Sequence, residues 1–171
     1  MARLGRVRLL AAMLFWASCA AHSAEQALDE AYAARVSRVH DGDTLWVQPL
    51  DGGRQRKLRI DGIDAPEICQ SGGLVARDAL RQRVMDRVVL VKERSLDRYG
   101  RPLAKVQLGR EDVAGWLVER GLAWSYRWRG DPGPYADQES VARMRGLGVF
   151  SDAQAEVPGD FRKRHGPCPA M

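Results

Sequence analysis

The sequence predicts an α+β fold in which five short strands form a small closed barrel and three helices pack against it. Runs rich in β-branched residues recur as expected for strands, whereas other segments carry apolar residues at intervals of three and four. Their order is three strands, one helix, two strands and two helices. A helix between the third and fourth strands suits a five-stranded barrel of the OB type. With 171 residues, the chain has the length of one globular domain.

The first three strands are expected to be consecutive and antiparallel. Residues 33–39 and 44–50 are short strand-like runs separated by His40-Asp41-Gly42-Asp43, a sequence typical of a hairpin turn. Asp51-Gly52-Gly53 makes the next turn. Residues 55–63 then alternate between apolar and charged side chains, as in a half-buried third strand.

The remaining elements are set by helical spacing and turn residues. After Ser71, a candidate cap, an amphipathic helix is indicated by the apolar positions Ala76, Ala79, Leu80 and Val84. Strands at 88–91 and 103–108 flank a turn at 97–102. Asp112 caps a second helix that runs to Arg120, and a third helix is expected at 137–145.

Residues 1–24 have the three parts of a secretory signal: Arg3, Arg6 and Arg8, then the apolar run 9–17, then small residues. A retained membrane anchor is the alternative, but an apolar core of about ten residues is too short to cross roughly 30 Å of hydrocarbon. We therefore expect a periplasmic or secreted protein with no membrane span after signal removal. A lipoprotein attached through Cys19 is a minor alternative, and a monomer is the default.

The positive charge of the chain lies partly in this leader. Its removal leaves 24 basic and 22 acidic side chains, so the formal net charge falls from +5 to +2. The total charge therefore says little about a nucleic-acid partner. An argument for phosphate binding must depend on where particular arginines lie.

Two cysteines, Cys69 and Cys168, remain in the mature chain. An oxidising compartment would let them pair across a loop of about 100 residues, for which chain entropy gives at most about 4.7 kcal/mol. Two separate thiols, or bonds to another chain, are the alternatives. Residues 25–150 are expected to form the domain and 151–171 a polar tail held by Cys168. Its run Arg162-Lys163-Arg164-His165 is expected to be solvated rather than a docking site.

Three charged clusters, at 41–44, 59–67 and 97–101, occur where the strand pattern turns a corner. Each alone could be an ordinary turn or polar loop. Together they supply hard oxygen ligands for a cation such as Ca²⁺, a carboxylate base, and two arginine forks for a phosphate. A cation and arginines offset charge on phosphate oxygens, while the carboxylate orients or deprotonates water. This is the set that phosphodiester cleavage needs.

In order and spacing, these motifs resemble the staphylococcal nuclease (thermonuclease) family, of the secreted bacterial type. Its pattern is an Asp-Gly-Asp-Thr turn, a segment from Arg to Asp-x-Pro-Glu, and Asp-[Lys/Arg]-Tyr-Gly-Arg, and the match covers about residues 36–150. The resemblance implies a five-stranded OB barrel with three helices. It also implies calcium-dependent hydrolysis of DNA and RNA with low sequence specificity, leaving 3′-phosphate and 5′-hydroxyl ends.

The resemblance also implies roles for single residues. Asp43 and Asp64 would be the calcium-binding carboxylates, and Ala65, where the founding member has Thr, would contact the metal through its backbone carbonyl. Arg59 and Arg101 would be the phosphate-binding arginines, and Glu67 would be the catalytic carboxylate. Arg98 and Tyr99 would lie near a terminal phosphate of the substrate.

The segment after Gly121-Leu122-Ala123 does not align cleanly with the family's substrate-contacting tyrosines. If it is extended, alternation puts Trp124, Tyr126 and Trp128 on one side and Arg127 and Arg129 on the other. Aromatic rings can stack on bases while arginines hold the backbone, which makes Tyr126 and Arg127 candidate substrate contacts. The alternative is that at least two of the rings pack on the barrel.

Two other classes of function are alternatives to a nuclease. A non-catalytic nucleic-acid-binding OB-fold module need not keep Glu67 between two arginines with both aspartates present. A barrel that binds oligosaccharide or a protein would have an acidic cation site only incidentally. The full catalytic set therefore favours the nuclease.

Overall fold

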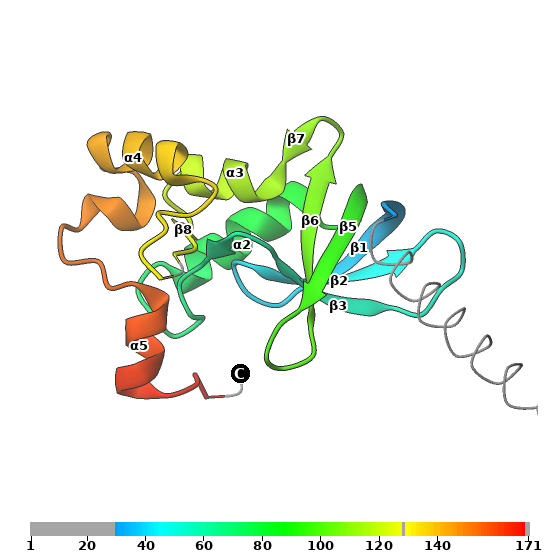
Figure 1. Cartoon of the computed structure of the whole chain (residues 1–171), viewed down its shortest axis with the longest axis horizontal. Helices are drawn as coiled ribbons and strands as arrows, with labels where there is room; N and C mark the ends of the chain where they lie inside the picture. Colours follow the sequence, from blue (N-terminus) through cyan, green and yellow to red (C-terminus); the bar gives the residue numbers. More distant parts are fainter. Residues whose placement is uncertain (1–29, 128, 170–171) are drawn as a thin grey trace, which may run out of the picture. The chain divides into compact units, whose positions relative to one another are not determined.

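Five strands close into a barrel, as predicted (Figure 1). Strands β1 (Tyr32–Val39), β2 (Thr44–Pro49) and β3 (Arg56–Ile60) form an antiparallel meander. Strand β5 (Val88–Leu96) runs antiparallel to both β1 and β6 (Pro102–Leu108). A parallel pairing of β3 with β6 closes the barrel and confirms the α+β class.

The computed structural model describes residues 30–169 except residue 128. The expected leader at 1–24 and Trp128 therefore lie outside the described residues. Within the part that is described, no helix has the length and apolar character that crossing a membrane requires.

The core lies inside the barrel and under the helix α2 (Gly73–Val84). Alternate residues of the strands point inward because successive side chains of a strand face opposite ways. Helix α2 adds Ala76, Leu80 and Val84 to the same cluster, as its spacing predicted. Its cap differs from the prediction. Gly72, in the left-handed region at φ 84°, precedes the helix, and no side chain, including that of Ser71, caps it.

The other two predicted helices are also present. The short strand β7 (Glu111–Asp112) leads into α3 (Val113–Glu119), where the side chain of Asp112 accepts the backbone N–H of Ala114 at 3.2 Å. Helix α4 (Ala136–Met144) packs beside α3. A second apolar cluster, formed by Trp124, Ala142 and Phe150, lies under α4.

The predicted third strand is broken into two pieces. Gly62, at φ 81°, ends β3 and redirects the chain, so residues Ile63–Asp64 form a separate strand β4. Strand β4 pairs with β8 (Trp124–Ser125) outside the barrel, in a register that places Asp64 opposite Trp124. This break carries Asp64 away from the sheet toward the helices.

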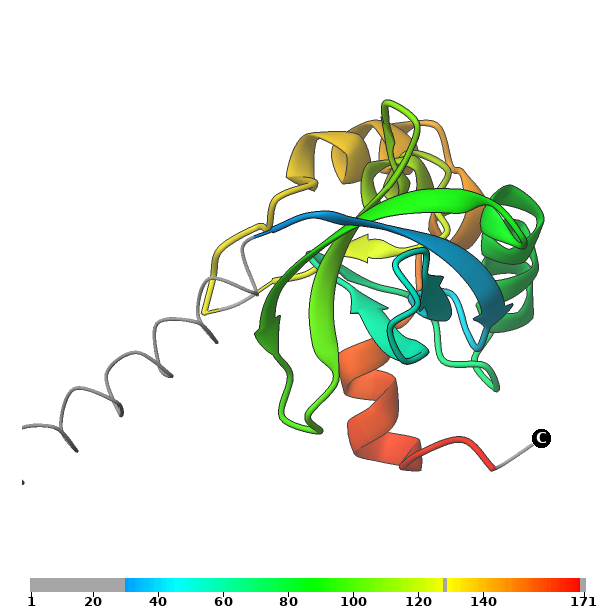
Figure 2. The same cartoon turned by 90° about the vertical axis from the view of Figure 1, so that its right-hand side faces the viewer.

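The segment 151–171, expected to be a polar tail without regular structure, contains a helix. A 3₁₀ turn, η1 (Gly148–Ser151), leads to a fourth helix, α5 (Pro158–His165). A disulfide joins Cys69 to Cys168, with 5.7 Å between their Cα atoms. In Figure 2, α5 is the red helix in the lower part of the view, below most of the strands. The helix escaped prediction because Pro158 is its one buried residue, so it has no apolar stripe.

Candidate active site

The candidate site forms where β2 begins, β3 ends and β4 leaves the barrel. Arg59, near the end of β3, is paired in register with Thr44 and thus lies beside Asp43. Its Nη1 donates to Asp43 Oδ1 at 2.9 Å and its Nη2 to Asp64 Oδ1 at 2.6 Å. Both carboxylates are buried. The structure thus brings three of the predicted site residues into direct contact.

The carboxylate of Asp43 is fixed from several directions. The backbone N–H of Ala65 donates to Oδ2 at 3.0 Å, and the Thr44 hydroxyl donates to Oδ1 at 2.9 Å. A carboxylate with this many donors has little freedom to turn. Ala65, a predicted metal contact, meets Asp43 through its backbone, so its short side chain does not weaken this link.

Burial and neighbouring charges shift the pKa values of two residues in the cluster, Asp41 and Arg59. Burial, followed by the neighbouring Asp43, raises the pKa of Asp41 to about 7. Burial alone would lower the pKa of Arg59, but Asp43 and Asp64 outweigh it and raise that pKa above its usual value. Arg59 is therefore a permanent cation that offsets part of the acidic charge.

Arg101 lies in the hairpin between β5 and β6. Asp97 holds this hairpin together, since its carboxylate accepts the Nε of Arg101 at 2.7 Å and the backbone N–H of Tyr99 at 2.8 Å. The guanidinium carbons of Arg98 and Arg101 lie 4.8 and 5.5 Å from the centre of the Tyr99 ring. Tyr99 itself is 67% exposed. These three predicted residues form one group, available to a ligand in solvent.

The barrel closure places this hairpin near the end of β3. The parallel register sets Arg59 opposite Leu103, two residues after Arg101. The pKa of His40 is lowered by burial and by nearby cations that include Arg101, while Asp43 opposes the shift. Both observations put the charge of Arg101 at the same end of the barrel as the carboxylates.

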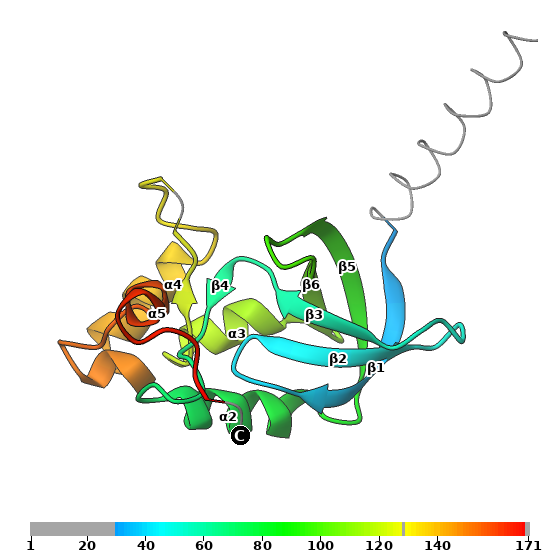
Figure 3. The same cartoon turned by 90° about the horizontal axis from the view of Figure 1, so that it is seen from below.

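Arg162 of α5 is a site residue that the sequence did not predict. Its Nη1 donates to Glu67 Oε1 at 2.6 Å and to Asp64 Oδ1 at 3.2 Å, and its Nη2 donates to Asp64 Oδ2 at 3.1 Å. Figure 3 shows α5 on the same side of the barrel as β4. Burial alone would lower the pKa of Arg162, but Asp64 and Glu67 raise it. Glu67 lies in the loop of residues 65–72 between β4 and α2, here called the Glu67 loop. The sequence signal available was Cys168, whose bond to Cys69 joins the α5 segment to this loop.

The two candidate substrate contacts after β8 differ in their surroundings. Tyr126 is 43% exposed, and its backbone N–H donates to Gly62 O at 2.9 Å, beside β4. The guanidinium of Arg127 instead pairs with Glu139 of α4. Trp124 is buried and meets Phe150 edge to face at 5.6 Å. One ring of the segment therefore packs in the protein and one faces solvent.

The donor chemistry of the site suits a hard cation. Asp43 and Asp64 offer buried carboxylate oxygens, and Ca²⁺ takes such oxygens together with backbone carbonyls and water. In residues 30–169, 128 aside, no three Asp, Glu, His or Cys side chains gather closely enough to hold an ion by themselves. Arg59 and Arg162 lie between the carboxylates. A cation would therefore share Asp64 with these guanidinium groups.

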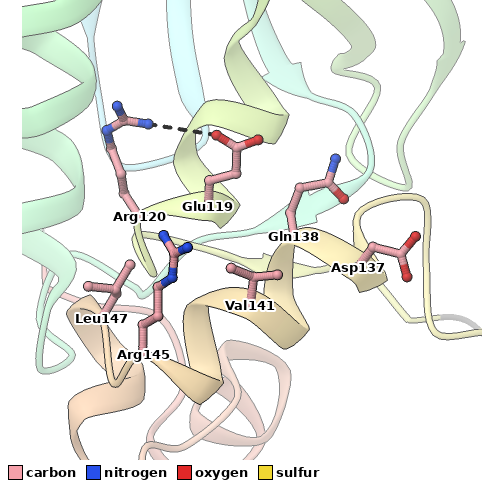
Figure 4. A pocket seen from close by; sticks show the side chains of 7 residues that line it. All are labelled: Glu119, Arg120, Asp137, Gln138, Val141, Arg145 and Leu147. Carbon is pink, nitrogen blue, oxygen red and sulfur yellow. Dashed lines mark ion pairs between the residues drawn. The ribbon is translucent and has the colours of Figure 1, made fainter.

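A separate pocket lies between α3 and α4, and its lining does not include Asp43, Asp64 or Glu67 (Figure 4). It is lined by Glu119, Arg120, Asp137, Gln138, Val141, Arg145 and Leu147. None of these is a predicted site residue. The chemistry-bearing residues therefore remain those at the barrel end.

The chain is similar to known proteins over about three quarters of its length. A family model described as staphylococcal nuclease homologue matches residues 57–152. The chain is 34% identical over 143 residues to the micrococcal nuclease of Shigella flexneri, covering 77% of this chain and 81% of that protein. It is 38% identical over 144 residues to protein ParB of Escherichia coli, covering 75% and 77%. An uncharacterized endonuclease of Haemophilus influenzae is 30% identical over 135 residues, covering 79% and 75%. The chain therefore belongs to the staphylococcal nuclease family.

Proposed function

We propose that this protein is an endonuclease that hydrolyses DNA and RNA with Ca²⁺ and low sequence specificity, leaving 3′-phosphate ends. The observation that carries the proposal is Arg59 held between the buried carboxylates of Asp43 and Asp64, with Glu67 three residues further along the chain. The nuclease and endonuclease names of its relatives support the same reaction class.

The chain's own residues have distinct parts in this reaction. Asp43, Asp64 and the backbone carbonyl of Ala65 would hold the cation, which when bound supplies positive charge close to the phosphate. Arg59 and Arg101 would donate to the phosphate oxygens, where negative charge grows in the transition state. Glu67 would orient the attacking water and accept its proton.

Binding of the nucleic acid would use the exposed residues around the site. Arg98 and Tyr99, on the same hairpin as Arg101, would contact a terminal phosphate. Tyr126 would stack on a base beside β4. Arg127 would approach the substrate only if its guanidinium left Glu139, so we assign it the smallest share of binding.

We further propose that the protein acts as a monomer in the periplasm or outside the cell. The disulfide between Cys69 and Cys168 supports this location, because such bonds persist in oxidising compartments and are rare in the cytosol.

A non-catalytic nucleic-acid-binding module is the second candidate, and one contact favours it. Arg162 covers Asp64 and Glu67, the carboxylates that a nuclease must use. A module that only binds nucleic acid could keep this contact permanently. The experiment below separates the two candidates.

The test is cleavage of single-stranded DNA and RNA by the oxidised, exported protein, with Ca²⁺ or with a chelator. Arg59→Ala should lower kcat by about 10²–10³ and Glu67→Gln by about 10²–10⁴. Arg83→Ala is the matched control, because Arg83 forms an exposed ion pair with Glu111 away from the site. Product ends are identified by phosphatase sensitivity of the 3′ termini. Binding without cleavage, or cleavage that survives both site substitutions, would refute the assignment and favour the binding module.

A further inference from the structure

Within the described residues, the carboxylate of Glu67 accepts a hydrogen bond from one partner only, Arg162. The backbone of Glu67 is fixed separately, since its N–H donates to Gln70 Oε1 at 3.1 Å and its carbonyl accepts the Gln70 N–H at 2.8 Å. The side chain still has rotatable bonds that these contacts do not restrain. The 2.6 Å bond from Arg162 therefore determines where the carboxylate points.

The loop that carries Glu67 is tied to both ends of the α5 segment. Before the helix, the backbone carbonyl of Glu156 accepts Gln70 Nε2 at 2.6 Å. After the helix, Cys168 is bonded to Cys69, whose backbone N–H lies 3.1 Å from the Cys168 sulfur. Loop and helix thus form one unit, and Arg162 lies between its two attachment points.

The geometry at Arg162 requires a guanidinium rather than any cation. Its Nη1 and Nη2 form a fork on the two oxygens of Asp64, and Nη1 also reaches Glu67. A planar fork can join two carboxylates in a fixed orientation, whereas an ammonium acts as a point charge. The neighbouring cations differ, because Lys163 and Arg164 are exposed and pair with Asp160 and Glu156.

We propose that Arg162 is a positioning residue that orients Glu67 for catalysis, and that the disulfide-linked helix α5 is therefore part of the active site. This rests on the nuclease function proposed above. Helix α5 lies outside the residues that the family model matches, which end at residue 152. In the basic run at 162–165, Arg162 thus departs from the expectation of a solvated side chain, whereas Lys163 and Arg164 are exposed as expected.

The experiment compares Arg162→Ala, Arg162→Lys and the matched control Arg164→Ala, in the full oxidised protein with saturating Ca²⁺ and single-stranded DNA. Loss of a residue that orients a catalytic group typically costs about 10–100-fold in activity. We expect that loss in kcat for Arg162→Ala, with KM changed by less than about threefold, and an equally low kcat for Arg162→Lys because the fork is absent. Arg164→Ala should stay within about twofold of wild type, since it removes only an exposed ion pair.

Free guanidinium ion supplies a readout that a merely structural role would not move. At concentrations far below those that unfold proteins, it should raise the kcat of Arg162→Ala and leave wild type and Arg164→Ala unchanged. Sodium chloride at the same ionic strength should restore nothing. Rescue also shows that the variant is folded, since an added ion could not repair a displaced helix.

Several outcomes would overturn the proposal. An Arg162→Ala protein as active as wild type would show that Glu67 needs no such partner, and a more active one would mark Arg162 as a competitor of the cation. A loss confined to KM would make it a substrate contact, and equal losses in Arg162→Ala and Arg164→Ala would leave α5 a structural support. A wild-type protein that does not cleave would refute the proposed function itself. An active wild type with an equally active Arg162→Ala variant would refute only the role proposed for Arg162.

Discussion

Glu139 of α4 is a buried carboxylate, only 2% exposed, that is linked to Asp64 through the paired strands β8 and β4. Its Oε2 accepts the backbone N–H of Ser125 at 2.8 Å, and its Oε1 accepts Arg127 and Arg143. Ser125 belongs to β8, the strand that pairs with β4 and hence with Asp64. We therefore predict that Glu139→Ala destabilises the fold and disturbs the site from a distance.

The expected loss follows from what each partner does afterwards. The Ser125 N–H is buried and would have no acceptor, which costs about 1–3 kcal/mol. Arg127 and Arg143 are 45% and 48% exposed, so water can solvate them and each lost pair costs about 1 kcal/mol at most. The total is about 3 kcal/mol. At roughly 3 °C per kcal/mol for a domain of this size, Tm should fall by about 10 °C.

Thermal unfolding of the oxidised protein without metal, in low and in high salt, tests this reasoning. Glu139→Gln keeps an oxygen for Ser125 and should lose only about 1 kcal/mol. Glu111→Ala is the control, because it removes an exposed pair with Arg83. The reasoning fails if Glu139→Ala costs no more than Glu111→Ala. It also fails if 1 M salt removes the difference from wild type, because an unpaired buried N–H is insensitive to salt while an ion pair is not.

Two further substitutions test the site more directly. A Cβ at Gly73 would lie 1.9 Å from the backbone carbonyl oxygen of Glu67, so Gly73→Ala should displace the Glu67 loop and lower both Tm and kcat. Gly115→Ala, whose Cβ would meet nothing closer than 3.6 Å, is its control, and equal effects of the two would contradict the steric argument. Asp41→Asn tests the charge of the cluster. Because the pKa of Asp41 is raised to about 7, the folded protein binds more protons than the unfolded chain from about pH 4 to 7, and stability falls as pH rises through that range. Asp41→Asn should therefore be more stable than wild type at pH 8, by at most about 4 kcal/mol, with little difference at pH 4, as measured by urea unfolding without metal. A difference that stays constant with pH would show that Asp41 is not the group responsible.

The barrel could be predicted because its determinants are local. Alternating burial in the strands and the spacing of Ala76, Leu80 and Val84 reflect one face of one element each. The cap of α2 could not be predicted from such patterns. Gly73 packs against the backbone of Glu67, so the chain needs glycine there, and Gly72 precedes the helix where a capping side chain would otherwise stand.

The same distinction divides the site. Asp43 and Arg59 lie beside each other because consecutive strands pair, so a sequence motif is enough to bring them together. Arg162 contacts Asp64 from 98 residues away, on a helix without an apolar stripe. Its position depends on a disulfide and on hydrogen bonds with the Glu67 loop, and these bonds leave no periodic pattern in the sequence. Even when Cys69 and Cys168 are assumed to pair, the sequence of residues 162–165 does not indicate which of these basic side chains contacts the carboxylates.

The arginines explain how this fold keeps several carboxylates together at one end of a barrel. Arg59 joins Asp43 to Asp64, and Arg162 joins Asp64 to Glu67, so each of these carboxylates has a guanidinium bonded to it. Asp41 belongs to the same cluster, but both forks are directed at its neighbours, and its pKa is raised. The contrast implies that the barrel alone compensates only part of the acidic charge it gathers. Helix α5 supplies a further part through Arg162. Because this guanidinium also bonds Glu67, the charge balance of the site and the orientation of its proposed base depend on the same side chain.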